Sequence, residues 1–126
     1  MGWRKRVLSF KYAFQGIKIL YQTQPNFIIH SVLGSLAILL AILLKLSYFE
    51  WLVLIVTITL VLFAEAINSA LEFLTDLISP DLHPLAGKAK DVAAAAVLIT
   101  AIGAVVVGLF LFLPKLLDVV KTLYTR

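Results

Sequence analysis

The sequence predicts an all-α integral membrane protein in which one amphipathic surface helix precedes three transmembrane helices. Of the 126 residues, 62% are hydrophobic and only 14% are charged, and the mean hydropathy is +1.03. A soluble domain is rarely so apolar, and runs long enough to cross a bilayer recur three times within one domain. The absence of cysteine excludes disulfides and thiolate metal sites. This composition also argues against a nucleic-acid partner.

Residues 1–24 are expected to form a helix that lies in the membrane interface. Apolar side chains recur there at steps of four and three, and the cations fall off that line. The apolar set is Trp3, Val7, Phe10, Phe14, Ile17 and Tyr21, and the cations are Arg4, Lys5, Arg6, Lys11 and Lys18. Interfacial helices have this separation of aromatic and basic side chains. Pro25 disfavours helix at Gln24 and is expected to end the element.

Three transmembrane helices are then expected at 28–45, 48–74 and 87–113. The first is short, but it is sufficient for a hydrocarbon core of about 30 Å, and aromatic residues mark the turn into the second. Pro80 and Pro84 indicate a cytoplasmic loop over 75–86. The third span carries no charge between 92 and 113, and Pro114 with Lys115 is expected to end it. A short basic tail occupies 114–126.

The distribution of cations predicts the orientation in the membrane. Three spans place the two ends of the chain on opposite sides. Lysine and arginine are more numerous before the first span and in the second loop than on the other side. The positive-inside rule therefore places the N-terminus and the 75–86 loop in the cytoplasm.

Three polar side chains interrupt the second span on one face of its helix. Glu65, Asn68 and Glu72 are spaced i, i+3 and i+7, so they project from the same side. A carboxylate in a membrane helix costs roughly 2.5–3.5 kcal/mol on insertion scales, which makes it a functional-site hypothesis. The predicted orientation places this stripe near the cytoplasmic surface. One polar stripe on a buried face indicates an ion, a proton or a phosphate as ligand.

A basic helix start is expected across the loop from these acids. Residues 87–91 (GKAKD) begin the predicted third span, where free N–H groups with Lys88 and Lys90 would bind an anion. Acids that hold Mg²⁺ opposite a site for phosphate suit phosphoryl transfer. A Walker motif is absent, because Leu82 and Ala89 stand where it needs glycine and a hydroxyl residue, and the protein-kinase loops are absent too.

The segments EAINSALEFLTD at 65–76 and HPLAGKAKDVAAAA at 83–96 carry a family resemblance. In sequence and spacing they resemble the prokaryotic diacylglycerol kinase family, which also contains undecaprenol kinases. The resemblance covers nearly the full chain. It implies a homotrimer in the bacterial inner membrane, with sites shared between protomers, that phosphorylates a lipid hydroxyl with ATP and Mg²⁺. The turn at 46–51 and the ending at 112–116 are more similar to the undecaprenol kinase branch.

The resemblance also implies roles for individual residues. Glu65 matches the general base that takes the proton from the lipid hydroxyl, Glu72 matches a metal ligand, and Asn68 is a polar positioning residue beside them. Nucleotide contacts are implied for Lys5, Tyr12, Asp81, His83, Lys90 and Asp91. The family usually has a further metal-binding glutamate before the first span, where this chain has Gln24. An amide is a weaker Mg²⁺ ligand than a carboxylate.

Hypotheses from different classes remain open. The first is a lipid kinase whose alcohol substrate, undecaprenol or diacylglycerol, enters laterally from the bilayer. The second is a kinase-like membrane protein without turnover that binds lipid or nucleotide, and Gln24 favours it. A proton or ion conduit would use the same acids, but these cluster at one face of the membrane instead of crossing it. An oligomer is expected, because three spans enclose a polar site poorly.

Overall fold

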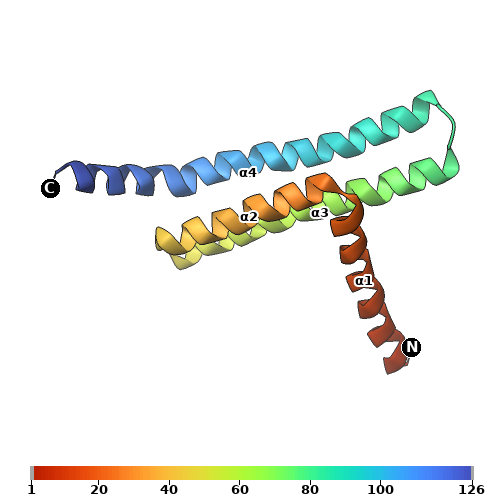
Figure 1. The fold of residues 1–126 in the computed structure, drawn as a ribbon, viewed down its shortest axis with the longest axis horizontal. Helices are drawn as coiled ribbons and strands as arrows, with labels where there is room; N and C mark the ends of the chain where they lie inside the picture. The colour runs from red at the N-terminus through yellow and green to blue at the C-terminus, as the bar shows by residue number, and fades with distance from the viewer. Residues whose placement is uncertain (1, 126) are drawn as a thin grey trace.

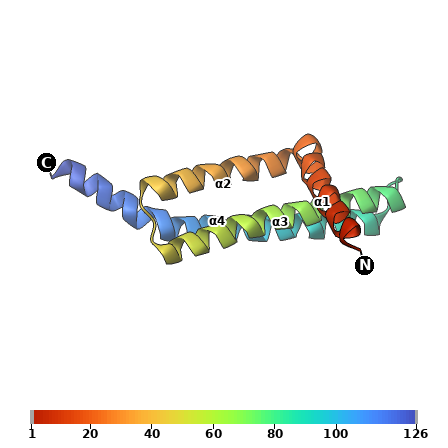
Figure 2. The same ribbon diagram turned by 90° about the horizontal axis from the view of Figure 1, so that it is seen from below.

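Four helices make up the computed structural model, which describes residues 2–125. They are α1 (Trp3–Thr23), α2 (Pro25–Leu43), α3 (Tyr48–Ile78) and α4 (Pro84–Tyr124). The last three run side by side, and α1 leaves them at a steep angle (Figure 1, Figure 2). The described residues contain no strand, which confirms the all-helical prediction. By length and composition α2, α3 and α4 can each cross a membrane, so the chain is a multi-pass membrane protein.

The helix ends on both sides of the second loop differ from the prediction. α3 continues to Ile78 and α4 begins at Pro84, so only 79–83 is non-helical in place of 75–86. His83 causes the early start, because its Nδ1 accepts the N–H of Leu85 at 3.1 Å and Pro84 suits the first helical position. The N–H of Gly87 then donates to the His83 carbonyl oxygen. The prediction of a helix start at 87–91 with free N–H groups is therefore wrong.

α4 also continues through Pro114, where the third span was expected to end, and it reaches Tyr124. Proline removes one N–H donor and its ring crowds the carbonyl four residues earlier. Residues 115–124 contain neither glycine nor a second proline, so the remaining helical bonds form beyond it. Figure 2 shows the dark blue end of α4 turning away from the direction of the rest of the helix, as a proline kink does.

The turn between α2 and α3 is fixed at both of its ends. Lys45 adopts a left-handed conformation with φ 52°, and the N–H of Leu46 donates to the Ala41 carbonyl oxygen at 3.1 Å. These are the features of a Schellman cap, whose apolar contact is made here by the buried Leu46 and Ala41. Ser47 then begins α3 with a capping box, in which the Glu50 carboxylate accepts the Ser47 N–H at 2.7 Å.

α3 and α4 form the most extensive helix pair, and an ion pair lies at each end of it. At the loop end, Lys90 Nζ lies 2.5 Å from Asp76 Oδ1. At the other end, Lys115 Nζ lies 3.1 Å from Oε2 of Glu50, in the first turn of α3. Exposed pairs of this kind contribute little energy, but they fix which ends meet. A small apolar core packs near the second ion pair: Ala41, Leu46, Leu54 and Leu111.

The approach of α2 to α3 depends on Gly34. A Cβ atom built at Gly34 would lie 3.1 Å from Cγ2 of Ile58 on α3, which is tighter than ordinary van der Waals contact. Small residues at membrane helix interfaces let backbones come close in this way. The missing side chain at Gly34 therefore sets the distance between the two helices.

α1 contributes no buried residue, and its specific contacts with α2 lie near its C-terminal end. The Tyr21 hydroxyl donates to Ser31 Oγ of α2 at 3.1 Å, and its ring meets Phe27 edge to face with centroids 5.0 Å apart. Gln24 is the single residue between the two helices, as the Gln24–Pro25 pair predicts. Interfacial placement of α1 stays a prediction.

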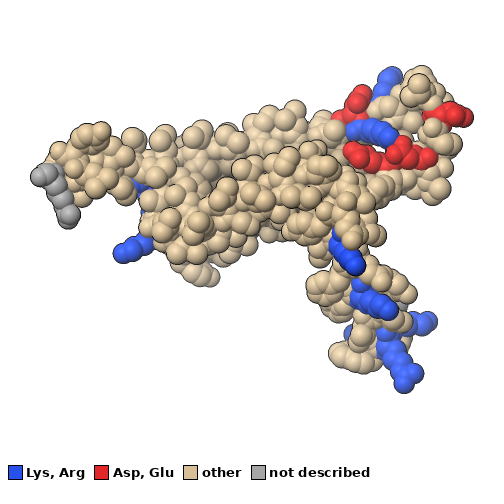
Figure 3. Space-filling view, in the orientation of Figure 1, with Lys and Arg blue, Asp and Glu red and all other residues tan. Residues whose placement is uncertain are grey.

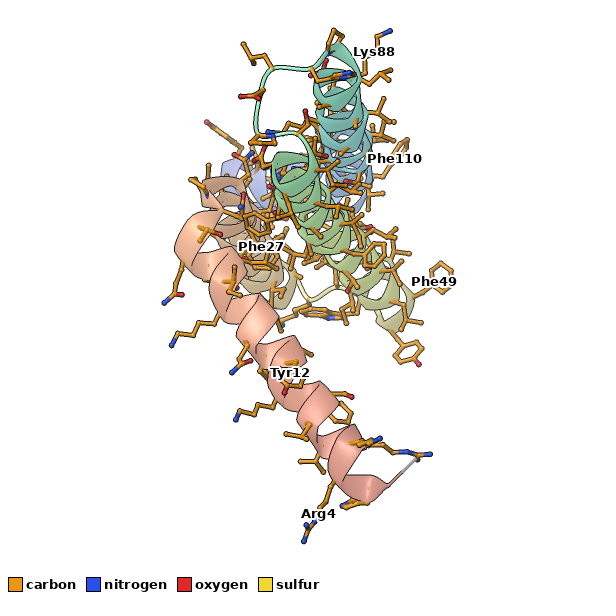
Figure 4. The ribbon with its side chains drawn as sticks, turned by 90° about the vertical axis from the view of Figure 1, so that its right-hand side faces the viewer. Arg4, Tyr12, Phe27, Phe49, Lys88 and Phe110 are labelled. Atoms are coloured by element: carbon orange, nitrogen blue, oxygen red, sulfur yellow. The ribbon has the colours of Figure 1, made fainter. Side chains whose placement is uncertain are left out.

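Figure 4 shows Phe49 and Phe110 pointing outward from α3 and α4, where lipid or another copy would cover them.

Candidate functional site

The polar stripe of α3 is buried in the structure. Among the described residues, the buried polar side chains are Glu65, Asn68 and Ser69, with exposed fractions of 1%, 6% and 0%. They lie together because residues three and four apart share one face of a helix. Glu72 extends this face by one turn and is half-buried. The sequence therefore predicted the stripe correctly but missed Ser69, which is part of it.

Two oxygens of the stripe lack a hydrogen-bond partner in the part of the chain that the structure describes: Glu65 Oε2 and Asn68 Oδ1. Asn68 Nδ2 donates to Glu72 Oε1 at 2.9 Å, and the Ser69 hydroxyl donates to the Glu65 carbonyl oxygen at 2.8 Å. A buried polar atom left without a partner costs about 1–3 kcal/mol, so it calls for an explanation. Two such acceptors side by side can take a proton donor or a cation.

His30 of α2 was not among the site residues predicted from the sequence. His30 and Val61 line one apolar groove, and Val61 lies one helical turn before Glu65. The sequence did contain one indication of this placement. His30 lies near the start of α2, and α2 runs antiparallel to α3, so His30 comes near the second half of α3, where Glu65 lies.

An apolar groove of about 300 Å³ runs between α2, α3 and α4 and comes within one helical turn of Glu65. His30 lines one part of it together with Val61, which lies one helical turn before Glu65. The remaining lining is rich in small residues, including Gly34, Ala37, Ala104 and Gly108. The groove is therefore suited to a flexible hydrocarbon chain.

Charged residues gather at the loop end of α3 and α4. Figure 3 shows acidic side chains there beside lysines, whereas α1 carries cations. The group comprises Glu72, Asp76, Asp81, Lys88, Lys90 and Asp91. Lys90 is paired with Asp76, so its positive charge is partly neutralised before any phosphate arrives. Asp81 and His83 lie in the non-helical segment, and Asp91 is exposed on α4.

The residues expected on the surface helix lie apart from this group. Lys5 and Tyr12 are exposed on the outer part of α1, and Figure 4 shows Tyr12 well along that helix. Gln24 is half-buried at the end of α1, where its Nε2 donates to Thr23 Oγ1 at 3.3 Å. A shallow hollow between Leu20 and Ser69 shows that the inner part of α1 passes beside the stripe. The fold of a single chain therefore brings the acidic residues together but leaves Lys5 and Tyr12 of α1 apart from them.

The donors of the stripe fit Mg²⁺. They are the carboxylate of Glu72 and the amide oxygen of Asn68, both hard oxygen ligands. No group of three or more His, Cys, Asp or Glu residues that could hold a metal occurs within residues 2–125. Mg²⁺ usually takes one or two carboxylates together with phosphate and water, so this set suits a metal that arrives with a phosphate.

A family model matches most of the chain. The model for prokaryotic diacylglycerol kinase covers residues 11–112. The chain belongs to the prokaryotic diacylglycerol kinase family. This family membership confirms both the resemblance and the lipid-kinase class of enzyme, and a kinase uses a nucleotide substrate.

Curated relatives within the prokaryotic diacylglycerol kinase family carry two different names. A diacylglycerol kinase from Synechocystis is 45% identical over 113 residues, which are 89% of this chain and 65% of that protein. An undecaprenol kinase from Bacillus subtilis is 38% identical over 108 residues, 86% of this chain and 88% of that protein. A diacylglycerol kinase from Escherichia coli is 32% identical over 105 residues, which are 83% of this chain and 86% of that protein. The chain thus spans just under two thirds of the Synechocystis relative.

Proposed function

We propose that this protein transfers the γ-phosphoryl group of ATP to the hydroxyl of a membrane lipid alcohol, undecaprenol or diacylglycerol. The observation that carries the proposal is Glu65, a fully buried carboxylate with one free oxygen. The chain belongs to a family of lipid kinases. Glu65 itself lies beside an apolar groove and below a cluster of charged side chains. A lipid kinase needs this combination, because its hydroxyl substrate is held by an apolar tail and its phosphate donor is charged.

Glu65 acts as the general base. Its Oε2 accepts the proton of the lipid hydroxyl, whose oxygen forms a bond to the γ-phosphorus while the bond to the β–γ bridging oxygen breaks and ADP leaves. Asn68 positions Glu72 through the bond from Nδ2 to Oε1. The lipid tail occupies the groove beside His30 and Val61, which brings the hydroxyl to Glu65 by lateral entry.

Glu72 and Gln24 would hold Mg²⁺ with the phosphates of the nucleotide. When bound, the cation offsets the negative charge of the transferring phosphate. Lys90 gives up its pairing with Asp76 and contacts phosphate instead. The other nucleotide contacts are Asp81, His83 and Asp91 at the loop end, and Lys5 and Tyr12 on α1. Because α1 points away from the loop end in one chain, these contacts fit an assembly in which protomers share a site.

The assembly is a homotrimer in the inner membrane of a bacterial cell, with the N-terminus and the site on the cytoplasmic side. The excess of cations on α1 and in the first turns of α4, where Lys88 and Lys90 lie, supports this orientation. The large apolar surface that one chain leaves exposed supports association with lipid and with further copies.

Transfer of labelled phosphate from ATP to a panel of lipid alcohols in mixed micelles tests the proposal and also identifies the lipid. We expect Glu65→Gln to lose about 10²- to 10⁴-fold in turnover, the usual contribution of a general base, while remaining folded. Circular dichroism and elution in detergent verify the fold of the variant. Full turnover in Glu65→Gln would remove Glu65 from the mechanism.

A second candidate is a kinase-like subunit that binds lipid or nucleotide with little or no turnover. Gln24 in place of the family's glutamate favours it, as does the small number of acids that could hold a metal within the described residues. ATP binding without a phosphorylated product from any lipid alcohol would support this candidate. So would a large gain of activity in Gln24→Glu, whereas substantial turnover of the unaltered chain would exclude it.

A further inference from the structure

α4 extends beyond the helices that it packs against. Its residues 115–124, here called the distal segment, follow Pro114 and lie outside the part that matches the family model, 11–112. At 1.5 Å per residue the 41 residues of α4 are about 60 Å long, twice the roughly 30 Å of a hydrocarbon core. The uncharged run at 92–113 is already long enough, about 33 Å, to fill the core. The distal segment therefore starts where the core ends.

The distal segment separates its side chains into two faces. At 3.6 residues per turn its apolar residues fill one continuous arc of roughly 160°, and its polar residues fill the remainder. The apolar arc holds Leu116, Leu117, Val119, Val120, Leu123 and Tyr124, and the polar arc holds Lys115, Asp118, Lys121 and Thr122. The apolar arc has nothing packed on it in one chain, since Leu123 and Tyr124 are 69% and 87% exposed.

Two surroundings are excluded by this pattern. Water does not cover a continuous apolar arc of six residues favourably, and hydrocarbon does not accept Asp118 and Lys121. The boundary between headgroups and acyl chains accommodates both faces at once when the helix lies flat. The bend at Pro114 turns the segment part of the way towards this orientation, and the ion pair between Lys115 and Glu50 holds the start of the segment beside the first turn of α3.

We propose that the distal segment is a second interfacial helix, lying on the lipid surface at the membrane face opposite the Glu65 site. Its apolar arc enters the acyl boundary and Lys121 contacts lipid phosphate. A lipid surface is favoured over a second copy of the chain, because an arc of roughly 160° is wider than the narrow stripe with which two helices form a coiled coil. The inference concerns only 115–124 and does not depend on the kinase activity.

The absence of cysteine makes a direct test possible. Single cysteines are introduced at each position from 116 to 124 in the full chain, spin-labelled, and placed in nanodiscs of phosphatidylcholine and phosphatidylglycerol. Accessibility to oxygen and to a water-soluble nickel chelate reports the depth of each label. Val120→Cys and Thr122→Cys form a matched pair on opposite faces. We expect depth to vary with the helical period, with the apolar arc about 10 Å deeper, the diameter of a helix.

Three results would overturn the proposal. High nickel accessibility at every position would place the segment in water, and high oxygen accessibility at every position would place it inside the core. Dipolar broadening between labels on different copies, confined to the apolar arc, would assign that face to a second chain. Depth that varies with the helical period without such broadening supports the lipid surface.

Discussion

Replacing Asn68 by leucine removes the hydrogen bond that orients Glu72 and keeps a side chain of similar size. That bond joins Asn68 Nδ2 to Glu72 Oε1 at 2.9 Å, between a buried and a half-buried residue. A hydrogen bond to a charged group contributes about 1.5–3 kcal/mol, which corresponds to a factor of about 10–150 in a binding constant. If Glu72 holds Mg²⁺, the half-saturating Mg²⁺ concentration of Asn68→Leu rises by this factor.

The assay is phosphorylation of a lipid alcohol by ATP in mixed micelles over a titration of Mg²⁺. Ser69→Ala is the matched control, because Ser69 is equally buried but bonds only to the backbone carbonyl of Glu65. We expect the control to change stability by about 1 kcal/mol at most and to leave the Mg²⁺ dependence unchanged. An unaltered Mg²⁺ requirement in Asn68→Leu would refute the role given to the Asn68–Glu72 pair.

Asn68→Asp gives a readout that does not need turnover. It keeps the shape of the side chain but turns the donor into a second carboxylate oxygen at about the same distance from Glu72. At an effective dielectric constant near 20, two charges 3 Å apart repel by about 5 kcal/mol. We expect this variant to unfold at a lower temperature than the unaltered chain and to regain stability on addition of Mg²⁺. Equal Mg²⁺ effects on both proteins would contradict the assignment of a cation site here.

Three further predictions concern the scaffold, and thermal unfolding in detergent measures each of them. Lys45→Gly should raise stability by about 1 kcal/mol, because glycine adopts the left-handed conformation without cost, and a loss would contradict the cap geometry. Gly34→Leu should cost about 1–3 kcal/mol by overpacking against Ile58, and adding Ile58→Ala should restore part of it. Lys115→Met should lower the midpoint at low salt and much less at high salt, because it breaks the pair with Glu50.

The helices and the stripe could be predicted from the sequence because each depends on local pattern. Apolar runs gave the three spans, Pro25 marked the break after α1, and the spacing of Glu65, Asn68 and Glu72 placed them on one face. The Ser47–Glu50 capping box also has a local signature, although the prediction read only a turn there.

The start of α4 and the surroundings of the site depend on information that local pattern lacks. Histidine is not among the usual helix caps, so the bond from the Leu85 N–H to His83 had no signature in the sequence. The pairing of Lys90 with Asp76 depends on how short the loop is, and the approach of His30 to Glu65 depends on how α2 packs on α3. Such contacts follow from tertiary geometry.

The two ion pairs of α3 and α4 also restrict how these helices can move. A slide of one helix along the other by one turn, about 5.4 Å, would separate Lys90 from Asp76 and Lys115 from Glu50 in the same step. Both pairs therefore favour a single register of α3 against α4, and the pair at Lys115 still holds this register when Lys90 turns from Asp76 to a phosphate. Movement of α2, which lines the groove and joins α1 at the single residue Gln24, would widen the groove for a lipid without changing this register.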